Sequence, residues 1–169
     1  MAQYELVDIG ANLGHPSYKD DFAAVLDRAK EAGLVKIMVT GTSEEISKQC
    51  ETLVAPYSGF LYFTAGVHPH DAKDWNSTTT LQTIRNLQQN PACVAVGECG
   101  LDFNRNFSPQ DVQRDVFRKQ VELAVELRKP LFIHEREAHK DMVEILGAFG
   151  DKLPPAKPKN ILKWDFILD

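Results

Sequence analysis

The chain has 169 residues, of which 43% are hydrophobic and 25% charged, the composition of an ordinary soluble globular protein with a single core. Its formal net charge of -5 excludes a general attraction to nucleic acid, so any such contact requires a local basic cluster. No apolar stretch is long enough to span a bilayer, and three cysteines without a Cys-x-x-Cys pair favour a reducing compartment, the cytoplasm or the nucleus.

Short apolar strands alternate with helical patterns along the chain. In chain order, the predicted strands cover 4–10, 35–40, 60–67, 93–98 and 130–134. The predicted helices follow each strand in turn, over 22–29, 46–54, 81–87, 110–128 and 142–149. Gly33 is placed to end the first helix, and the T-x-x-E pattern of Thr42 and Glu45 predicts a capping box for the second.

The five βα units predict a parallel α/β fold. Strands that helices cover on both faces are continuous apolar runs, as these are. Periodicity alone does not distinguish an open doubly wound sheet from part of a (β/α)8 barrel. The chain contains no glycine-rich dinucleotide or P-loop motif that would favour a nucleotide-binding fold.

The last segment, 153–169, has a different pattern. It begins rich in Pro and Lys, which is typical of a linker. Apolar residues then alternate with their neighbours at Leu162, Trp164, Phe166 and Leu168, a pattern that predicts a strand.

Polar side chains gather at the carboxyl ends of the strands, where chemistry is concentrated in parallel α/β proteins. The strand ends supply Asp8 and Asn12, then His68 and His70, then Glu98 and Asp102, and finally His134, Glu135 and Arg136. Carboxylate and imidazole together are typical ligands of a divalent ion that activates water. Glu98 is the strongest candidate, because a buried strand leaves its carboxylate little access to solvent.

Each of the other candidates also has a purely structural interpretation. His68 and His70 could flank a turn, and Asp102 could cap the turn after its strand. Arg105 and Arg136 could pair with nearby acids or hold a phosphate bidentately.

Four segments together resemble the TatD family of metal-dependent nucleases: VDIGANL (7–13), GVHPHDA (66–72), GECGLDFNRNFS (97–108) and PLFIHEREAH (130–139). The resemblance implies an incomplete TIM-type (β/α)8 barrel over 1–156, with a divergent tail over 157–169. It implies a hydrolase that cleaves phosphodiester bonds in DNA, a deoxyribonuclease of the exonuclease type. It also implies a divalent metal cofactor, Mg²⁺ or alternatively Mn²⁺ or Zn²⁺, at a two-ion site.

By position, Glu98 matches the metal-bridging glutamate of the family and His134 its metal-binding histidine. The residues assigned to substrate binding are Asn12, His68, His70, Arg105 and Arg136. Two positions depart from the family pattern. Gly10 and Asn12 stand where a His-x-His is frequent, and Glu135 replaces a cysteine, which puts a negative charge near any phosphate.

The resemblance also predicts three further βα units, with another metal-binding histidine and the catalytic aspartate, where this chain has its tail. We therefore expect an incomplete two-ion site and no identified catalytic residue. Open barrel edges would favour self-association, unless the tail adds a strand beside the fifth strand.

Three functions remain open. The first is a TatD-type deoxyribonuclease, which requires that water, substrate or a second chain replace the missing ligands. The second is a non-catalytic truncated form that acts as a binding module or is inert. The third is a metal-dependent amidohydrolase acting on a small molecule.

Overall fold

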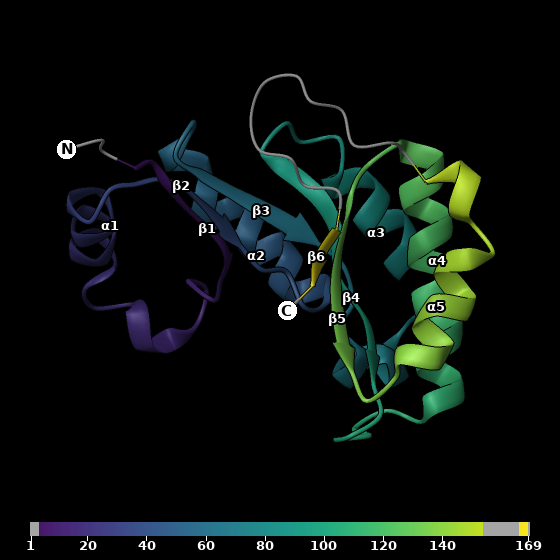
Figure 1. Cartoon of the computed structure of the whole chain (residues 1–169). Coiled ribbons are helices and arrows are strands. Elements are labelled where there is room, and N and C mark those ends of the chain that lie inside the picture. Colours follow the sequence, from purple (N-terminus) through teal and green to yellow (C-terminus); the bar gives the residue numbers. More distant parts are fainter. Residues whose placement is uncertain (1–3, 154–165, 169) are drawn as a thin grey trace.

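The computed structural model describes residues 4–153 and 166–168. One parallel sheet holds its strands in chain order, β1-β2-β3-β4-β5-β6 (Figure 1). The strands are β1 (Leu6–Ala11), β2 (Leu34–Val39), β3 (Leu61–Ala65), β4 (Cys93–Asp102), β5 (Leu131–Arg136) and β6 (Phe166–Leu168). In the described part of the chain β1 pairs only with β2 and β6 only with β5, so the sheet is open.

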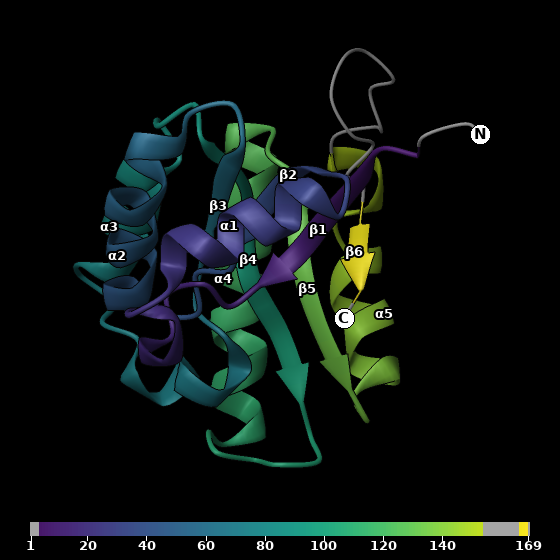
Figure 2. The ribbon, with the colours of Figure 1, turned by 90° about the vertical axis from the view of Figure 1, so that its left-hand side faces the viewer.

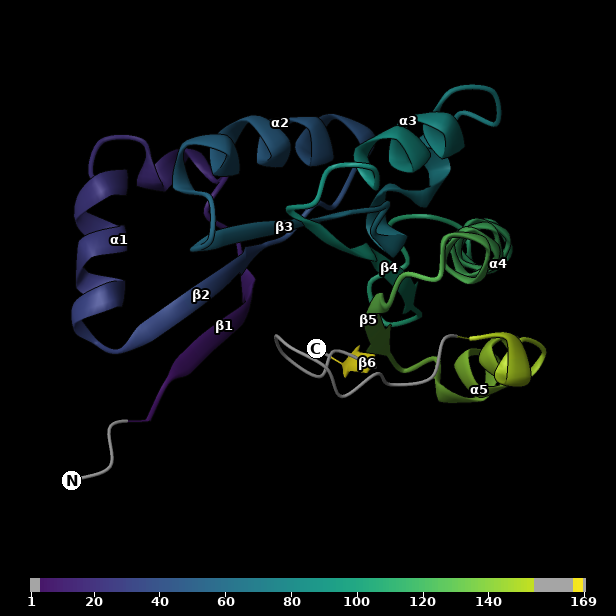
Figure 3. The ribbon, with the colours of Figure 1, turned by 90° about the horizontal axis from the view of Figure 1, so that it is seen from above.

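Five α-helices lie along the outer side of the curved sheet, as the view from above shows (Figure 3). They are α1 (Phe22–Glu31), α2 (Glu44–Val54), α3 (Thr80–Leu87), α4 (Gln110–Leu127) and α5 (His139–Gly147). Short 3-10 turns occur at η1 (Pro16–Tyr18), η2 (Ala55–Tyr57), η3 (Pro69–Asp74) and η4 (Gly150–Lys152). The predicted incomplete barrel of βα units is therefore confirmed. No helix among the described residues has the length and apolar character needed to cross a membrane.

The carboxyl ends of the strands point to the same side of the molecule (Figure 2). The predicted fourth strand ended too early, at Glu98. It continues to Asp102, because Gly100 and Asp102 pair with His134 and Arg136 of β5. This extension carries the end of β4 alongside the end of β5 and brings their polar side chains together.

The predicted capping box was wrong by one residue. The N-cap of α2 is Ser43, whose Oγ accepts a hydrogen bond from the Ile46 N–H at 3.2 Å. The carbonyl of Thr42 instead accepts the His68 N–H at 2.8 Å, which ties the loop after β2 to the loop after β3. Gly33, after α1, adopts a φ of 94°, a conformation that favours glycine, as predicted.

The core lies mainly between the sheet and its helices. Phe63 of β3 and Phe117 of α4 are fully buried there. A smaller cluster of Met38, Ala95 and Phe132 includes the ring of Phe132, which reaches across toward β1. A methyl group added at Gly10 would lie 3.7 Å from the tip of that ring, an ordinary contact distance, so the ring lies close to β1 at this point.

The tail contributes β6, which pairs in parallel with β5 and aligns Leu131 with Phe166 and Ile133 with Leu168. This confirms the predicted strand beside the fifth strand at residues 166–168, which pair with the first half of β5. The proposed boundary at 156/157 and the alternating residues Leu162 and Trp164 lie outside the described residues. Self-association through the remaining edges stays a prediction.

Candidate functional site

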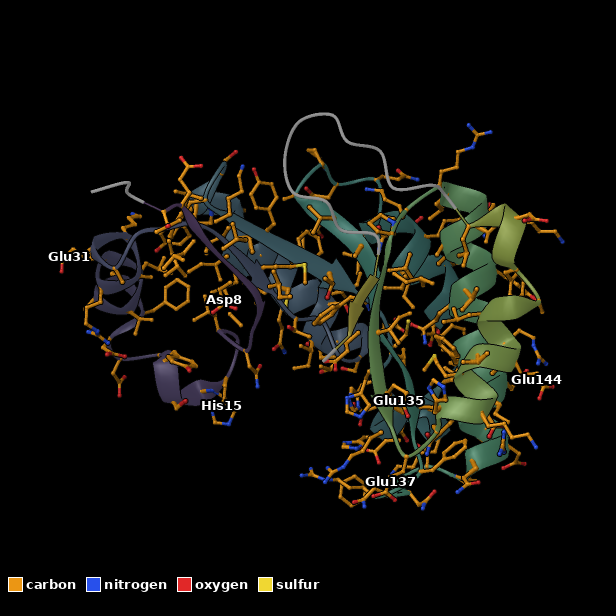
Figure 4. The ribbon with its side chains drawn as sticks, viewed as in Figure 1. Asp8, His15, Glu31, Glu135, Glu137 and Glu144 are labelled. Atoms are coloured by element: carbon orange, nitrogen blue, oxygen red, sulfur yellow. The ribbon has the colours of Figure 1, made fainter. Side chains whose placement is uncertain are left out.

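A cleft of about 550 Å³ opens at the carboxyl ends of β3, β4 and β5. It is lined by Thr42, His68, His70, Asp71, Glu98, Asp102, Arg105, Phe107, His134 and Arg136. Both predicted metal ligands and four of the five predicted substrate residues are therefore brought together. Asn12 is the exception, since it is exposed and does not line the cleft. Asp8 also lies on the β1 side, well away from Glu135 at the end of β5 (Figure 4).

Three side chains form a group that could hold a metal ion. Ligand atoms of His68, Glu98 and His134 all lie within 4.8 Å of one another. Oε1 of Glu98 is 3.6 Å from Nε2 of His68 and 3.4 Å from Nδ1 of His134. Glu98 is only 7% exposed, so its carboxylate is directed into this polar group and away from bulk water.

Two glycines allow the strands to bring these residues together. A methyl group at Gly66 would lie 2.5 Å from the Cα of Gly97, so β3 and β4 approach closely just before His68 and Glu98. Gly97 has a φ of 144°, and a methyl group there would lie 2.2 Å from the carbonyl oxygen of Phe132. The glycines that open the GVHPH and GECG segments are therefore required by packing.

His68 is held as a neutral imidazole. Its burial, together with the nearby His134 and His70, lowers its pKa to about 3. Its Nδ1 accepts the His70 N–H at 3.1 Å, at the start of η3. This hydrogen bond assigns the proton to Nε2, the atom that faces Glu98. His68 therefore fixes the turn and also presents a donor to the cleft.

Asp102 has two roles, one at each oxygen. Oδ1 accepts the backbone N–H groups of Asn104 and Arg105 at 3.0 and 2.9 Å, which confirms the predicted turn cap. Oδ2 lies 2.7 Å from Nε2 of His70 and 3.3 Å from Nε2 of His134. Complete burial would raise its pKa, but these hydrogen bonds and the two histidines lower it to about 2, so Asp102 is ionised.

His134 lies between two carboxylates, with Glu98 at its Nδ1 and Asp102 at its Nε2. Burial alone would lower its pKa, but the hydrogen bonds and negative charges of Glu98 and Asp102 outweigh burial and raise it. The same carboxylates that favour an imidazolium favour a metal cation at this position.

Arg105 and Arg136 line the cleft without a salt bridge to any carboxylate in the described residues. Both guanidinium groups are thus available for an anionic ligand. The predicted negative charge of Glu135 near a phosphate stays a prediction. Its Oε1 accepts the Ala138 N–H at 2.7 Å, at the start of α5, and it does not line the cleft.

A family model described as TatD related DNase matches residues 7–159 of the chain, a span that includes every cleft-lining residue. The chain belongs to the TatD family. It is 44% identical over 151 residues to the 3'-5' ssDNA/RNA exonuclease TatD of Yersinia pseudotuberculosis and 45% identical over 151 residues to that of Erwinia amylovora. Each alignment covers 89% of this chain and 58% of the relative, so the chain spans little more than half of their length.

Solved structures of TatD-family proteins share the fold. A TatD-family hydrolase from Entamoeba histolytica superposes with a TM-score of 0.80 at 28% identity, covering 89% of this chain and 56% of that one. A TatD homologue from Escherichia coli K12 gives a TM-score of 0.75 at 29% identity, with 85% and 55% covered. An uncharacterized amidohydrolase from Saccharomyces cerevisiae gives 0.78 at 26% identity, with 86% and 52% covered.

Two glutamines of α4 support this TatD-family site, although no sequence motif pointed to them. Gln113 Oε1 accepts the Asp102 N–H at 2.8 Å, and its Nε2 donates to the Asp102 carbonyl at 3.0 Å. Gln120 forms the same pair of bonds with the backbone of Val67, at 2.8 and 3.0 Å. Both glutamines are fully buried. Their spacing of seven residues, on the same face as Val116 and Phe117, was the available signal.

Proposed function

We propose that this chain carries the metal- and phosphate-binding part of a nuclease that hydrolyses phosphodiester bonds in DNA, as an exonuclease. One observation carries this proposal: a buried carboxylate and imidazoles converge beside two arginines that have no carboxylate partner in the described residues. The names of the relatives, which are ssDNA/RNA exonucleases, support single-stranded nucleic acid as the substrate class.

The donor set fits a divalent cation. Glu98 and His134 are the proposed protein ligands, because each presents an atom to the same point and neither accepts a backbone N–H of residues 4–153. His68 is not assigned as a ligand, since its Nδ1 accepts a backbone hydrogen bond and its Nε2 carries a proton. Mg²⁺ is the proposed ion, with Mn²⁺ and Zn²⁺ as alternatives. A divalent ion there supplies polarisation of a phosphoryl oxygen and a lowered pKa of water.

The remaining residues bind and orient the substrate. Arg105 and Arg136 neutralise phosphate charge, and each guanidinium can donate two parallel hydrogen bonds. The Nε2–H of His68 lies 3.6 Å from Oε1 of Glu98 and is available to donate to a phosphoryl oxygen. Asp102 holds the rings of His70 and His134 in place through Oδ2. In this role Asp102 positions two cleft residues without touching the substrate.

Two alternatives use the same residues. With two direct protein ligands among the described residues, the chain would bind metal and phosphate but turn over slowly, which is the binding-module interpretation. The fold is shared with the yeast protein named an amidohydrolase, so hydrolysis of a small amide is the second alternative. The two arginines without acidic partners favour a phosphodiester, which carries a negative charge that an amide lacks.

The test compares the wild type with Glu98→Gln, which removes a charge but keeps the shape. The matched control is Glu144→Gln, because Glu144 is an exposed carboxylate on α5, away from the cleft (Figure 4). Thermal melts with and without Mg²⁺ or Mn²⁺ report metal binding, and cleavage of a labelled single-stranded oligonucleotide reports turnover.

We expect metal to raise the melting temperature of the wild type and of Glu144→Gln but not of Glu98→Gln. We also expect the wild type and Glu144→Gln to cleave the oligonucleotide and Glu98→Gln not to cleave it. Binding without cleavage would support the binding module. Equal metal responses in all three proteins would refute the site assignment.

A further inference from the structure

The loop between β4 and α4 is fixed to its surroundings by buried hydrogen bonds. Ser108 is fully buried, and its Oγ donates to the His70 carbonyl at 2.8 Å and accepts the Lys73 N–H at 3.0 Å. The Ser108 carbonyl in turn accepts Nε2 of Gln113 at 2.8 Å. The backbone at this point therefore has a defined position relative to η3 and α4.

The preceding residue, Phe107, keeps its side chain in solvent despite this fixed backbone. Its side chain lines the cleft, and the residue is 57% exposed. The ring contacts His70 edge-to-face, with 4.8 Å between ring centres, and the Phe107 carbonyl accepts Nζ of Lys73 at 3.2 Å. None of the other large hydrophobic residues that are exposed in the described residues, Tyr4, Leu6, Val35 and Val143, lines this cleft.

An exposed aromatic ring on a fixed backbone loses little conformational entropy when it binds a flat ligand. Two residues before it, Arg105 lines the same cleft without a carboxylate partner among the described residues. A phosphate-binding cation next to an exposed ring matches the alternation of phosphate and base along a single strand. A base paired in a duplex is already stacked on its neighbours, so the ring is suited to an unpaired base.

We propose that Phe107 is a stacking platform for an unpaired nucleobase of the strand whose phosphate lies between Arg105 and Arg136. This inference rests on the proposed function, because it takes nucleic acid as the ligand of the cleft. It adds a preference that the metal ligands cannot supply, because the cleft then favours single strands that carry a base next to the bound phosphate. Stacking gives little discrimination between the bases.

The experiment measures binding of labelled single-stranded DNA by fluorescence anisotropy, with the full chain and with EDTA present so that no cleavage occurs. One oligonucleotide carries all its bases, and a second has a stretch of abasic sites. The variants are Phe107→Ala and Phe107→Leu. Val143→Ala is the matched control, because Val143 is 56% exposed on α5 and does not line the cleft.

We expect Phe107→Ala to weaken binding of the base-carrying strand by roughly 5- to 150-fold, the range for loss of one stacked base. Phe107→Leu should show an intermediate loss, and Val143→Ala none. The abasic strand should bind the wild type and Phe107→Ala equally. Thermal melts should show that all variants fold, because the replaced side chains are exposed.

An equal loss for both strands in Phe107→Ala would overturn the inference, as would wild-type affinity for the base-carrying strand in either Phe107 variant. In those cases the wild type still binds DNA, so the proposed function stands. Failure of the wild type to bind either strand would overturn the inference, while the metal-dependent melts and the cleavage assay described above decide the proposed function separately.

Discussion

The carboxylate of Asp102 offers a direct test of how the site is held together, through the variant Asp102→Asn. Asparagine keeps the shape and retains an oxygen for the N–H groups of Asn104 and Arg105. It removes the negative charge that faces His70 and His134 and replaces the accepting Oδ2 with an amide NH2, which cannot accept from their Nε2 atoms. The substitution therefore tests the charge together with its hydrogen bonds to the two histidines, at a residue that is fully buried.

The magnitude follows from the pKa of this carboxylate. Its fall from the ordinary value of 3.8 to about 2 corresponds to about 2 kcal/mol of stability. Because the folded pKa is the lower one, this stability is fully present above about pH 5. It is lost as the pH falls from 3.8 through 2. Asp102→Asn should therefore cost about 2 kcal/mol at pH 7 and progressively less at low pH.

The assay is urea unfolding followed by circular dichroism at pH 7, 4 and 3, with EDTA present. The control is Asp115→Asn, since Asp115 is 61% exposed and, within the part of the chain that the structure describes, pairs only with Lys119 one helical turn away. Such a pair contributes less than about 0.5 kcal/mol. A loss for Asp102→Asn no larger than for the control, or a loss that is the same at pH 7 and pH 3, would show that the Asp102 carboxylate does not stabilise the fold in this way.

Three further predictions concern packing and the tail. Gly66→Ala should severely lower the yield of folded protein, because the added methyl group would lie 2.5 Å from the backbone of β4. The control Gly147→Ala should melt at the same temperature as the wild type, because its methyl group would have no atom within 4 Å. Glu44→Gln should lower the free energy of unfolding in urea by about 1 kcal/mol at pH 7, because Lys48 and hydroxyl donors of α3 lower the pKa of the Glu44 carboxyl. The loss should be smaller below the unfolded pKa of about 4, and the control Glu45→Gln should lose less than Glu44→Gln at pH 7. Deleting 157–169 should lower solubility and melting temperature by exposing the edge of β5, and unchanged values would contradict a role for β6.

The order and type of the first five strands could be predicted from sequence because each is a short apolar run followed by an amphipathic helix. The ends of elements were harder to predict. Thr42 and Ser43 both fit an N-cap, and the choice depends on the backbone: Ser43 is extended, while the Thr42 carbonyl bonds to His68. The length of β4 depends on its pairing with β5, which no local pattern reports.

The candidate site was predictable where a residue type is costly to bury, and not where its role depends on orientation. Glu98 could be found because a carboxylate at the end of an apolar strand requires partners. Asn12 does not line the cleft, and its role in substrate binding stays a prediction. Position at a strand end does not say whether the side chain reaches the cleft. Gln113 and Gln120 were missed because glutamine on a helix usually faces solvent, although both fall on the buried stripe of α4.

If the proposed function holds, the contacts that support the cleft explain why this chain should bind nucleic acid even where it does not cleave it. The cleft is built mainly on the neighbouring strands β3, β4 and β5, and α4 holds the ends of two of them through Gln113 and Gln120. These contacts do not involve β1, so the arginines and Phe107 keep their places in an open sheet. Hydrolysis requires a better-held metal ion than binding does, because two protein ligands leave most of the ion's coordination to water. Affinity for single-stranded DNA should therefore depend on Arg105 and Phe107, and the rate of cleavage on Glu98, so that Glu98→Gln removes cleavage while binding in EDTA persists.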